Sequence, residues 1–352
     1  MLRIIVTAIG CPGGPSIIQA LREDKNLFII GTDIRENMAA RFLVDRFVKV
    51  PAGNNPDFIP FMVDLVKRYH VAAILPLATF ELLPLSKNQA VFEEKGCRVC
   101  VSDYQSLEIA NNRFLLYNFF KNASFIPKFR ILKNGDQLGE LLKEFGFPEE
   151  KVVVKPFIGH GSIGLRIINN DVDLYEDYRN NKPNHINIPF QLAKSIFSHK
   201  ELNDILLSEY LSGPEFGVDM LIDPKNNKII KAIIRDNGEV FHSEISNGKI
   251  IEQSEILYIV EQIVSSLKLA YTINIDIKTD KKGCPKLIEI NPRIPATSFL
   301  AVSSGLNLPL YSIYLAINKK IPKKAIKKDK RIFSYRGFIV VNNKGKIKSK
   351  AL

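Results

Sequence analysis

The chain has 352 residues, 46% hydrophobic and 24% charged, which is ordinary for a globular protein and excludes disordered and fibrous classes. The net charge of +12 would suggest a nucleic-acid partner, but residues 319–352 alone hold thirteen Lys and Arg against one acid, Asp329. Few aromatics interleave with these cations and no amphipathic helix is evident. We therefore interpret 319–352 as a solvated basic tail and expect neither nucleic acid nor a membrane as partner.

The N-terminus and the cysteines indicate the compartment. The first residues lack the charged and apolar regions of a signal peptide, and no apolar run reaches the length of a membrane span. Cys97 and Cys100 form a C-x-x-C, but no second such pair and no neighbouring histidine completes a zinc site. We expect buried structural cysteines in a cytoplasmic protein.

Two buried strands and a helix open the chain. Residues 2–9 and 27–33 are apolar strand patterns, and residues 16–23 between them have a helical pattern. This order predicts an α/β domain with a parallel sheet. The intervening turn is glycine-rich, but Pro12 and Pro15 lack the backbone donors that a pyrophosphate would use, so we favour a structural turn or a small-substrate contact.

The stretch VVVKPFIGHGSIGLRII, residues 152–168, contains a G-x-G-x-x-G at Gly159, Gly161 and Gly164. β-Branched residues precede the glycines and an apolar strand pattern follows them, so the loop joins two strands. A dinucleotide fingerprint requires a helix after the loop, which excludes that class here. Lys155 precedes the glycines, and the kinase and phosphate-loop motifs are absent.

The middle of the chain alternates regular and irregular patterns. Residues 111–123 read as a helix, and residues 169–203 are polar and irregular, as in a long connection or the edge of a lid. Residues 204–223 predict two strands about the turn at Ser212, Gly213 and Pro214. A later helix is predicted by six apolar residues at helical spacing: Ile256, Ile259, Val260, Ile263, Val264 and Leu267.

Residues 272–293 predict a strand, a turn and a second strand. Placing the turn at its midpoint sets Asp276 roughly opposite Glu289, and Asn291 follows two positions after Glu289 on the same face. Two carboxylates and an amide carbonyl are hard oxygen ligands suited to magnesium, although a solvent-facing polar face is an equally common use of such a hairpin. Arg293 comes next, and a fork-shaped cation beside a metal cluster suits phosphoryl transfer.

Three motifs in order, VVVKP with its glycine hairpin, then SEYLSGPEFGVDM, then LIEINPR, resemble the ATP-grasp superfamily. Among its members the chain is most similar to stand-alone ligases that resemble half of the carbamoyl phosphate synthetase large subunit. The resemblance implies an ATP-grasp fold of the α/β and α+β classes. It divides the chain into a Rossmann-like pre-grasp domain (1–110), an ATP-grasp domain (111–318, with a lid subdomain at about 120–205 and a metal-binding subdomain at about 206–318) and the basic tail (319–352).

The resemblance also implies which residues bind the nucleotide. Lys155 matches the lysine on the α and β phosphates, and Arg113 matches a basic residue ahead of the lid, although Asn112 stands where the family usually has an acid. The glycine loop matches the lid over the β and γ phosphates, and Glu215 matches the acid on the ribose hydroxyls. The lid residues are Gly159, Gly161, Ser162 and Gly164, and the adenine-reading linker is Glu209, Tyr210 and Leu211.

The remaining implied residues are metal ligands and substrate contacts. Asp276, Glu289 and Asn291 match the magnesium ligands, and Arg293 matches the catalytic arginine at the γ-phosphate and the acylphosphate. Arg235 matches an arginine that often faces the substrate carboxylate. We expect substrate selectivity to arise partly in the pre-grasp domain, around residues 79–82.

The resemblance implies an ATP-dependent carboxylate-amine ligase with ATP and Mg²⁺ or Mn²⁺ as cofactors. Lys155 and Arg293 would be its catalytic residues, and a small carboxylate and an amine its substrates. A second copy of the chain is a further candidate partner. The alternatives are a related enzyme that acts on bicarbonate or formate, a non-catalytic ATP-binding sensor, and nucleic-acid binding through the tail. No residue is marked as a general base, and His160 and His242 are candidates by position only.

Overall fold

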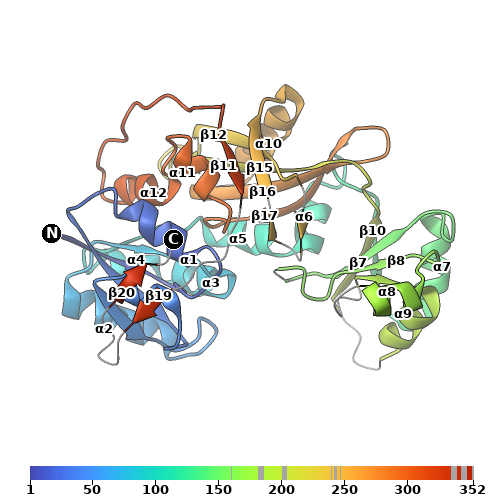
Figure 1. Ribbon diagram of the computed structural model, residues 1–352, viewed down its shortest axis with the longest axis horizontal. Helices are drawn as coiled ribbons and strands as arrows, with labels where there is room; N and C mark the ends of the chain where they lie inside the picture. Colours follow the sequence, from blue (N-terminus) through green and yellow to red (C-terminus); the bar gives the residue numbers. More distant parts are fainter. Residues whose placement is uncertain are drawn as a thin grey trace. The chain divides into compact units, whose positions relative to one another are not determined.

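The computed structural model describes residues 1–159, 161–180, 186–199, 204–238, 240–241, 244–245, 247–333, 339–341 and 347–350. The chain divides into two compact units (Figure 1). Unit 1 comprises residues 1–108, 215–276 and 290–352, and unit 2 comprises residues 109–214 and 277–289. Each unit is therefore built from segments that are far apart in the sequence. The domain boundaries expected at residues 110 and 318 stay a prediction.

Unit 1 begins with the predicted parallel sheet, in the order β3-β2-β1-β4-β5. Ile4 and Val6 of β1 face one core cluster, and Ile5 between them faces another, because alternate residues point to opposite faces of a strand. Helices cover both faces, which explains why the strands are almost continuously apolar. The strands are β1 (Leu2–Val6), β2 (Leu27–Asp33), β3 (Arg46–Lys49), β4 (Ala73–Leu75) and β5 (Arg98–Val99). The helices are α1 (Gly14–Leu21), η1 (Ala39–Phe42), α2 (Phe58–Tyr69), α3 (Thr79–Lys87), α4 (Gln89–Glu93) and α5 (Tyr104–Asn111), whose last residues belong to unit 2.

The glycine turn after β1 is filled by the protein's own atoms. The amide of Gly10 donates to Asp33 at 2.8 Å, and a Cβ atom on Gly10 would lie 2.7 Å from the Arg35 guanidinium. A Cβ atom on Gly14 would lie 1.9 Å from the carbonyl oxygen of Ile9. These glycines are required by close backbone packing, which supports the interpretation of a structural turn.

A second sheet, in the order β17-β16-β11-β12-β15-β18, contributes to both units. The predicted hairpin is present as β16 and β17, and residues 277–289 at its tip belong to unit 2. The predicted helix is also present as α10, with its five apolar positions from Ile256 to Val264 buried. The strands are β11 (Glu215–Ile222), β12 (Ile229–Asp236), β15 (Asn247–Ile251), β16 (Tyr271–Thr279), β17 (Pro285–Asn291) and β18 (Arg331–Phe333). The helices are α10 (Ser254–Ser266), α11 (Phe299–Ser303) and α12 (Leu308–Ala316), and two short strands, β13 (Val240–Phe241) and β14 (Glu244–Ile245), pair with each other.

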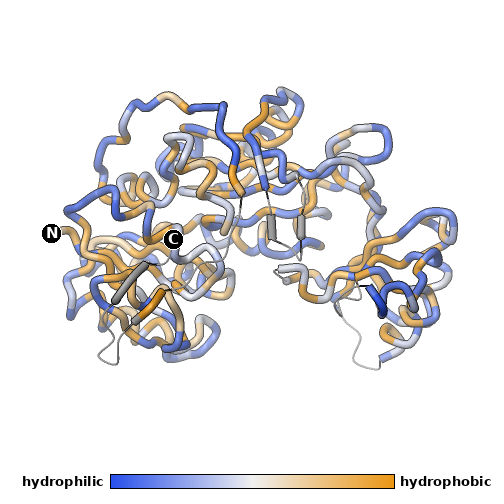
Figure 2. Tube along the Cα trace, viewed as in Figure 1, coloured by the Kyte–Doolittle hydropathy of each residue, from blue (hydrophilic) through white to orange (hydrophobic). Residues whose placement is uncertain are grey.

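Unit 2 is built on a five-stranded sheet in the order β6-β10-β7-β8-β9. Figure 2 shows hydrophobic stretches along these strands, and residues from α7 and α9 complete the core. The expectation that residues 169–203 are irregular is wrong, because they include α8, β9 and α9, and Ala193 and Phe197 of α9 are buried. The elements are α6 (Arg113–Phe119), β6 (Phe129–Leu132), η2 (Gly135–Gln137), α7 (Leu138–Glu144), β7 (Val152–Pro156), β8 (Arg166–Ile168), α8 (Leu174–Asn180), β9 (Asn187–Ile188), α9 (Phe190–Phe197) and β10 (Ile205–Glu209).

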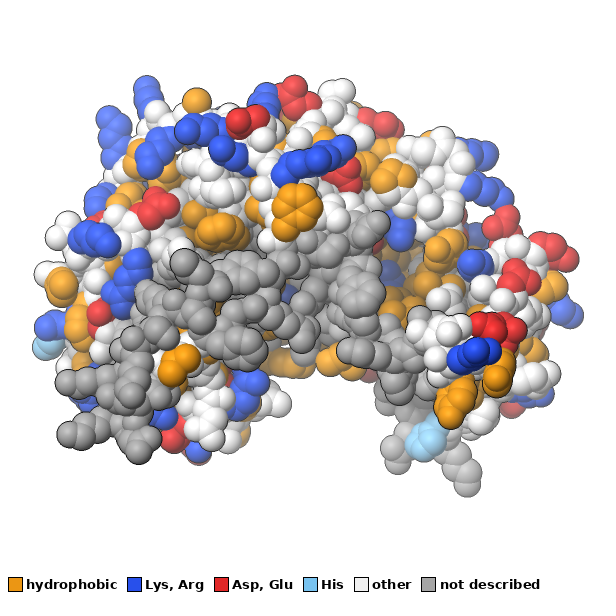
Figure 3. All heavy atoms as spheres, in the orientation of Figure 1, with side chains coloured by type: hydrophobic (Ala, Val, Ile, Leu, Met, Phe, Trp, Pro, Cys, Tyr) orange, Lys and Arg blue, Asp and Glu red, His pale blue; other side chains and the backbone are white. Residues whose placement is uncertain are grey.

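The basic tail is more ordered than the sequence suggests. Ile321 and Ile326 pack against the unit 1 core, β18 pairs with β15, and β19 (Ile339–Val341) pairs with β20 (Ile347–Lys350). The lysines of 319–328 nevertheless remain exposed. Lys and Arg side chains gather at the upper left of Figure 3, over the segment that follows α12 in Figure 1.

The cysteines of the C-x-x-C are structural, as expected. Cys97 and Cys100 are both buried and free. Burial raises the pKa of the Cys97 thiol to about 12, and burial also raises the pKa of Cys100. Neither thiol is in a state suited to redox or metal chemistry at neutral pH.

Candidate active site

The glycine loop is a hairpin, as the flanking valines predict. Strands β7 and β8 pair antiparallel, with Val152 opposite Ile168. Gly161, Ser162 and Gly164 have positive φ angles of 58°, 59° and 79°, a region that glycine adopts at little cost. All three residues are exposed, while His160 lies outside the described residues. The loop tip therefore offers backbone groups to solvent, as a lid over phosphates requires.

Lys155 is buried near the end of β7. Its side chain is 8% exposed, and its ammonium group donates to the hydroxyl of Tyr117 at 3.1 Å. Burial, together with the charge of Arg113, lowers the pKa of Lys155 to about 7, and Glu289 opposes this shift. A buried cation with so low a pKa lacks a matching anion, which a bound phosphate would supply.

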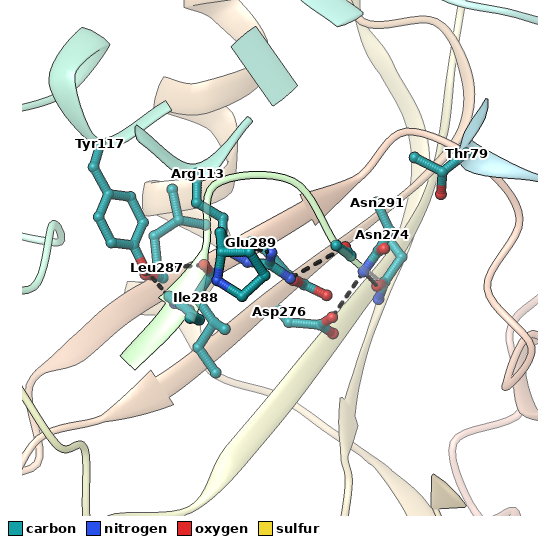
Figure 4. Close-up of polar contacts among 12 residues, drawn as sticks. Thr79, Arg113, Tyr117, Asn274, Asp276, Leu287, Ile288, Glu289 and Asn291 are labelled. Carbon is teal, nitrogen blue, oxygen red and sulfur yellow. Dashed lines mark hydrogen bonds and ion pairs between the residues drawn. The ribbon is translucent and has the colours of Figure 1, made fainter. Parts of the chain in front are cut away.

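Arg113 connects the helix α6 to the lid. The side chain of Asn112 caps α6 by accepting from the amides of Phe114 and Leu115, at 3.0 and 3.1 Å. The guanidinium of Arg113 donates to the carbonyl of Gly159 at 3.3 Å and forms an ion pair with Glu289 (Figure 4). Asn112 thus takes the role of helix cap, and Arg113 holds a predicted metal ligand.

Tyr117 belongs to this cluster and was not predicted. It is 1% exposed, and its hydroxyl lies 3.1 and 2.9 Å from the carbonyl oxygens of Leu287 and Ile288 (Figure 4). The hydroxyl therefore bridges Lys155 to the backbone of β17. Its position four residues after Arg113 places both side chains on one face of α6, which is the signal that could have identified it.

The predicted adenine linker follows β10. The carboxylate of Glu209 accepts from the backbone amide of Lys128 at 2.8 Å. The Tyr210 ring lies 5.5 Å from the ammonium of Lys151 and 6.0 Å from that of Lys278. Leu211 is 7% exposed. Glu209 therefore joins the linker to the backbone of Lys128, directly before β6, and adenine reading by these residues stays a prediction.

In unit 1, Asp276 and Asn291 are bonded directly. The amide nitrogen of Asn291 donates to Asp276 at 2.9 Å and to Asn274 at 3.1 Å (Figure 4). Asp276 and Asn274 lie on β16 and Asn291 ends β17. Asn274 was not predicted, although it alternates with the buried isoleucines of β16 just as Asp276 does.

Further buried polar residues continue from Asn274 into unit 1. Its amide nitrogen donates to Asp219 at 3.0 Å, and the guanidinium of Arg235 lies 3.4 Å from the same carboxylate oxygen. Arg235 also donates to Asn237, which in turn donates to Glu215 at 3.2 Å. Arg235 is 1% exposed and Asp219 fully buried. The structure thus places Arg235 on an internal carboxylate, and its contact with substrate stays a prediction.

Arg293 lies at the carboxyl edge of the parallel sheet. Its Nε donates to the Thr79 hydroxyl at 3.3 Å, and its backbone amide donates to the carbonyl of Asn291 at 2.8 Å. Thr79 begins α3, which follows β4. Ligands of open α/β sheets bind at this edge. The structure therefore brings Arg293 to the segment in which the sequence placed substrate selectivity.

Glu81 is a second unpredicted group at the same edge. It is 5% exposed and accepts a hydrogen bond from the Thr7 hydroxyl, which itself accepts from the amide of Leu77 at 3.3 Å. Burial raises the pKa of Glu81 to about 7, against the opposing effect of the Thr7 bond. A buried carboxyl group that titrates near neutrality is a feature of functional sites.

The hairpin β16–β17 offers donors that fit magnesium. Among the described residues, no three His, Cys, Asp or Glu side chains gather as a metal site. The expected ligands, however, are two carboxylates and an amide oxygen, and Mg²⁺ binds few protein groups while keeping places for phosphate and water. Asp276 and Asn291, both in unit 1, are side chains of the kind that the ion takes, and the hydrogen bond from the Asn291 nitrogen holds them next to each other.

Two family models match separate parts of the chain. The model described as "PylC-like, N-terminal domain" matches residues 4–100, and that described as "ATP-grasp in the biosynthetic pathway with Ter operon" matches residues 201–337. A crystal structure of N5-carboxyaminoimidazole synthetase from Staphylococcus aureus with ADP superposes with a TM-score of 0.66, covering 91% of this chain and 78% of that one at 13% identity. The chain has the ATP-grasp fold.

Other ATP-grasp relatives are carboxylases and ligases. The chain is 24% identical over 280 residues to the 2-oxoglutarate carboxylase small subunit of Hydrogenobacter thermophilus, which covers 74% of this chain but only 54% of that subunit, about half its length. The biotin carboxylase domain dimer of that enzyme, with MgADP and bicarbonate, gives a TM-score of 0.64 at 20% identity over 94% of this chain and 73% of that one. An L-amino acid ligase from Bacillus licheniformis gives 0.62 at 16% identity over 90% and 74%.

The comparisons extend the sequence-based interpretation in two ways. Two of the similar structures contain ADP or MgADP, in line with the expected nucleotide and ion. The N-terminal match is to a PylC-like domain, while the carbamoyl phosphate synthetase likeness stays a prediction. Within the described part of the chain, no helix is long and apolar enough to cross a bilayer.

Proposed function

We propose that this ATP-grasp protein is an ATP-dependent ligase that activates a small carboxylate as an acylphosphate and joins it to an amine. The observation that carries the proposal is the arrangement on β17. Asn291 is bonded to Asp276, Glu289 stands two residues before it, and Arg293 stands two residues after it at the edge of the parallel sheet. Phosphoryl transfer depends mainly on a metal ion and cations that position the phosphoryl group and stabilise its charge. Metal ligands followed by an arginine at the ligand-binding edge of the sheet can meet this requirement.

The residues of the two units take different parts in this proposal. Lys155 binds the α and β phosphates, which supply the anion that its buried ammonium lacks. Asp276, Glu289 and Asn291 would hold Mg²⁺, which neutralises charge on the transferring phosphoryl group. Arg293 faces the γ-phosphate and the carboxylate that attacks it.

The proposed reaction has two steps that balance without a further reactant. A carboxylate oxygen of the substrate attacks the γ-phosphorus, and the bond to the β-phosphate oxygen breaks to release ADP. The amine nitrogen then attacks the acyl carbon, phosphate leaves with the bonding electrons, and the nitrogen loses a proton. Lys155 and Arg293 bind and orient the charged groups in the first step.

The test is ADP and phosphate release from ATP and Mg²⁺ across a matrix of small carboxylates, amines and bicarbonate. Lys155→Ala and Glu289→Gln are the inactive variants. Lys281→Ala is a matched control, because Lys281 is an exposed lysine of unit 2 that pairs with Glu150 at 2.5 Å. The proposal requires that one acid and amine pair stimulate the release of ADP and phosphate in the wild type and in Lys281→Ala. The same pair must not stimulate release in Lys155→Ala or Glu289→Gln. Stimulation by bicarbonate without an amine would replace ligation by carboxylate phosphorylation.

A second candidate function is a non-catalytic nucleotide sensor. The ion pair between Arg113 and Glu289 favours it, because a guanidinium here neutralises a carboxylate that an enzyme would give to the metal. Such a sensor would bind ADP with the same affinity in the presence and absence of Mg²⁺. An enzyme would bind it more tightly with the ion, and calorimetric titration under both conditions separates the two.

A further inference from the structure

The side-chain amide of Asn291 has a defined orientation. Its nitrogen donates to two oxygens, on Asp276 at 2.9 Å and on Asn274 at 3.1 Å. A planar amide that uses both N–H groups on one side must direct its oxygen to the other side. These two bonds therefore determine where the oxygen of a proposed metal ligand points.

The orientation of Asn274 is fixed in turn by Asp219. An ionised carboxylate can only accept, so the amide nitrogen of Asn274 must face Asp219, at 3.0 Å. The oxygen of Asn274 is then the end that faces Asn291. The guanidinium of Arg235 lies 3.4 Å from the same oxygen of Asp219, so this carboxylate faces a cation inside the protein.

The other side of Arg235 orients a second amide by the same logic. Its guanidinium can only donate, so it faces the oxygen of Asn237, and the nitrogen of Asn237 then faces Glu215 at 3.2 Å. Glu215 is the predicted ribose ligand. One buried ion pair is thus connected by hydrogen bonds, through one asparagine on each side, to both a proposed metal ligand and a proposed nucleotide ligand.

The pair is poorly suited to stabilising the fold. Asp219 and Arg235 are 0% and 1% exposed, and one polar atom of each, Oδ2 and Nε, has no hydrogen-bond partner among the described residues. Removing two charges from water costs several kcal/mol, and apolar replacements of such pairs are often as stable. A function in orientation accounts for the pair better than stability does.

We propose that Asp219 and Arg235 are positioning residues that set the amide orientations of Asn274 and Asn237, and through them the metal ligand Asn291 and the nucleotide ligand Glu215. This inference rests on the proposed nucleotide and metal binding at the hairpin β16–β17. In this inference both residues of the ion pair act within the fold and not on the reacting atoms. Their effect passes through two asparagine amides.

The first test compares Asn274→Ala with Asn307→Ala. Asn307 is a matched control, because it is also a 2% exposed asparagine of unit 1, but its amide donates to the carbonyl of Ala20 at 2.9 Å. Binding of Mn²⁺ in the presence of ADP is measured by electron paramagnetic resonance, with thermal unfolding in parallel. We expect Asn274→Ala to weaken Mn²⁺ binding by about 10-fold or more, as for other residues that orient metal ligands. Asn307→Ala is expected to lower only the unfolding temperature.

The second test exchanges the two side chains across the bond. Asn274→Asp alone sets two carboxylates against each other, whereas Asn274→Asp with Asp219→Asn restores one donor and one acceptor across this bond. The exchange also turns the new amide nitrogen toward Arg235, because Asn274 and Arg235 contact the same oxygen of Asp219. We expect the single change to weaken Mn²⁺ binding and the exchange to recover part of it. Equal binding by all variants, or equal losses in Asn274→Ala and Asn307→Ala, would overturn the inference. Absence of Mn²⁺ binding in the wild type itself would instead overturn the proposed function.

Discussion

Two polar clusters in this protein differ in how fully their own residues partner one another. In unit 2, Lys155 is buried beside Arg113 and balanced only in part by Glu289, so its pKa falls to about 7. In unit 1, the chain from Asn291 through Asp219 to Glu215 is bonded at each step. The first cluster needs an anion to complete it, and the second holds its geometry by itself.

Under the proposed function, this difference separates the recognition of phosphate from the positioning of the metal ion. Groups that must recognise phosphate are kept short of a counter-charge, so that the ligand's charge is strongly attracted in a region of low dielectric constant. Groups that must hold an ion at fixed positions are oriented by bonds within the fold. Substitutions in the two clusters should therefore fail in different ways, and the predictions below go from the largest expected effect on activity to the smallest.

The largest effect is expected at Arg293 of unit 1, whose side chain donates to the hydroxyl of Thr79 and the carbonyl of Ile294. Arg293→Lys should lower kcat by about 100-fold or more, because a lysine cannot reproduce the fork of donors on a developing charge. ADP affinity should change little. Arg22→Lys, at the partly exposed pair with Asp45, is the control that should leave kcat unchanged. A large loss of ADP affinity in Arg293→Lys would mean that the residue binds nucleotide and does not act on the transferred group.

Lys155→Met should weaken ADP binding by about 10- to 100-fold, because one hydrogen-bonded charge pair contributes about 1.5–3 kcal/mol. The effect tests whether the cluster in unit 2 is completed by phosphate. Isothermal titration with ADP measures it, and Lys281→Met, at an exposed lysine of the same unit, is the control. Unchanged ADP affinity in Lys155→Met would contradict the assignment of this lysine to the phosphates.

Nucleotide binding should take up a proton at Lys155. The pKa of about 7 in the free protein leaves the lysine mostly neutral at pH 8, and an adjacent phosphate favours the charged form. We expect uptake approaching one proton at pH 8 and close to none at pH 6, where the lysine is already charged. Titrations in buffers of different ionisation enthalpy give this number. Lys155→Met should abolish the dependence on buffer, and uptake that persists in the variant would assign the proton to another group.

The smallest effect on activity is expected at Glu81, whose pKa is raised to about 7 in the folded protein from an ordinary value of 4.5. The folded state then binds more protons than the unfolded state between these values, so the contribution of Glu81 to stability is present below pH 4.5 and is lost as pH rises through 7. The free energy of unfolding of Glu81→Gln, measured relative to that of the wild type, should therefore be higher at pH 8 than at pH 5. Urea unfolding at both pH values measures the difference, about 1.4 kcal/mol for each pKa unit removed. An equal effect at both values would show that Glu81 does not titrate in this range.

The parts of the fold that can be predicted from the sequence are those that depend on local residue patterns. Period-two alternation predicts the hairpin β16–β17, β-branched flanks predict the glycine hairpin, and helical spacing predicts α10. The predicted site residues Asp276 and Asn291 do come together, and Arg113 does contact the lid. These features depend on neighbours that are close in the chain or on motifs in a known order.

Long-range contacts could not be predicted in the same way. Asp219 meets Asn274 only because β11 pairs with β16, and no local pattern specifies that pairing. Likewise, α9 lies in the mostly polar segment 169–203 but buries Ala193 and Phe197 against strands that are distant in the sequence. The compact units are also assembled from distant segments, because the tip of one hairpin belongs with residues 109–214. Strand pairing and packing decide these features, and both involve residues far apart in the chain.

The short strand β18 bears on solubility. It pairs with β15 and forms the last strand of the six-stranded sheet, an edge whose open backbone groups would otherwise invite another chain to pair. β18 is only three residues long, begins with the exposed Arg331, and follows a run that includes the exposed Lys327 and Lys328. Shortness and like charge are the features by which natural sheets discourage aggregation at their edges. The surplus of lysine that first suggests a nucleic-acid partner thus guards the protein against self-association.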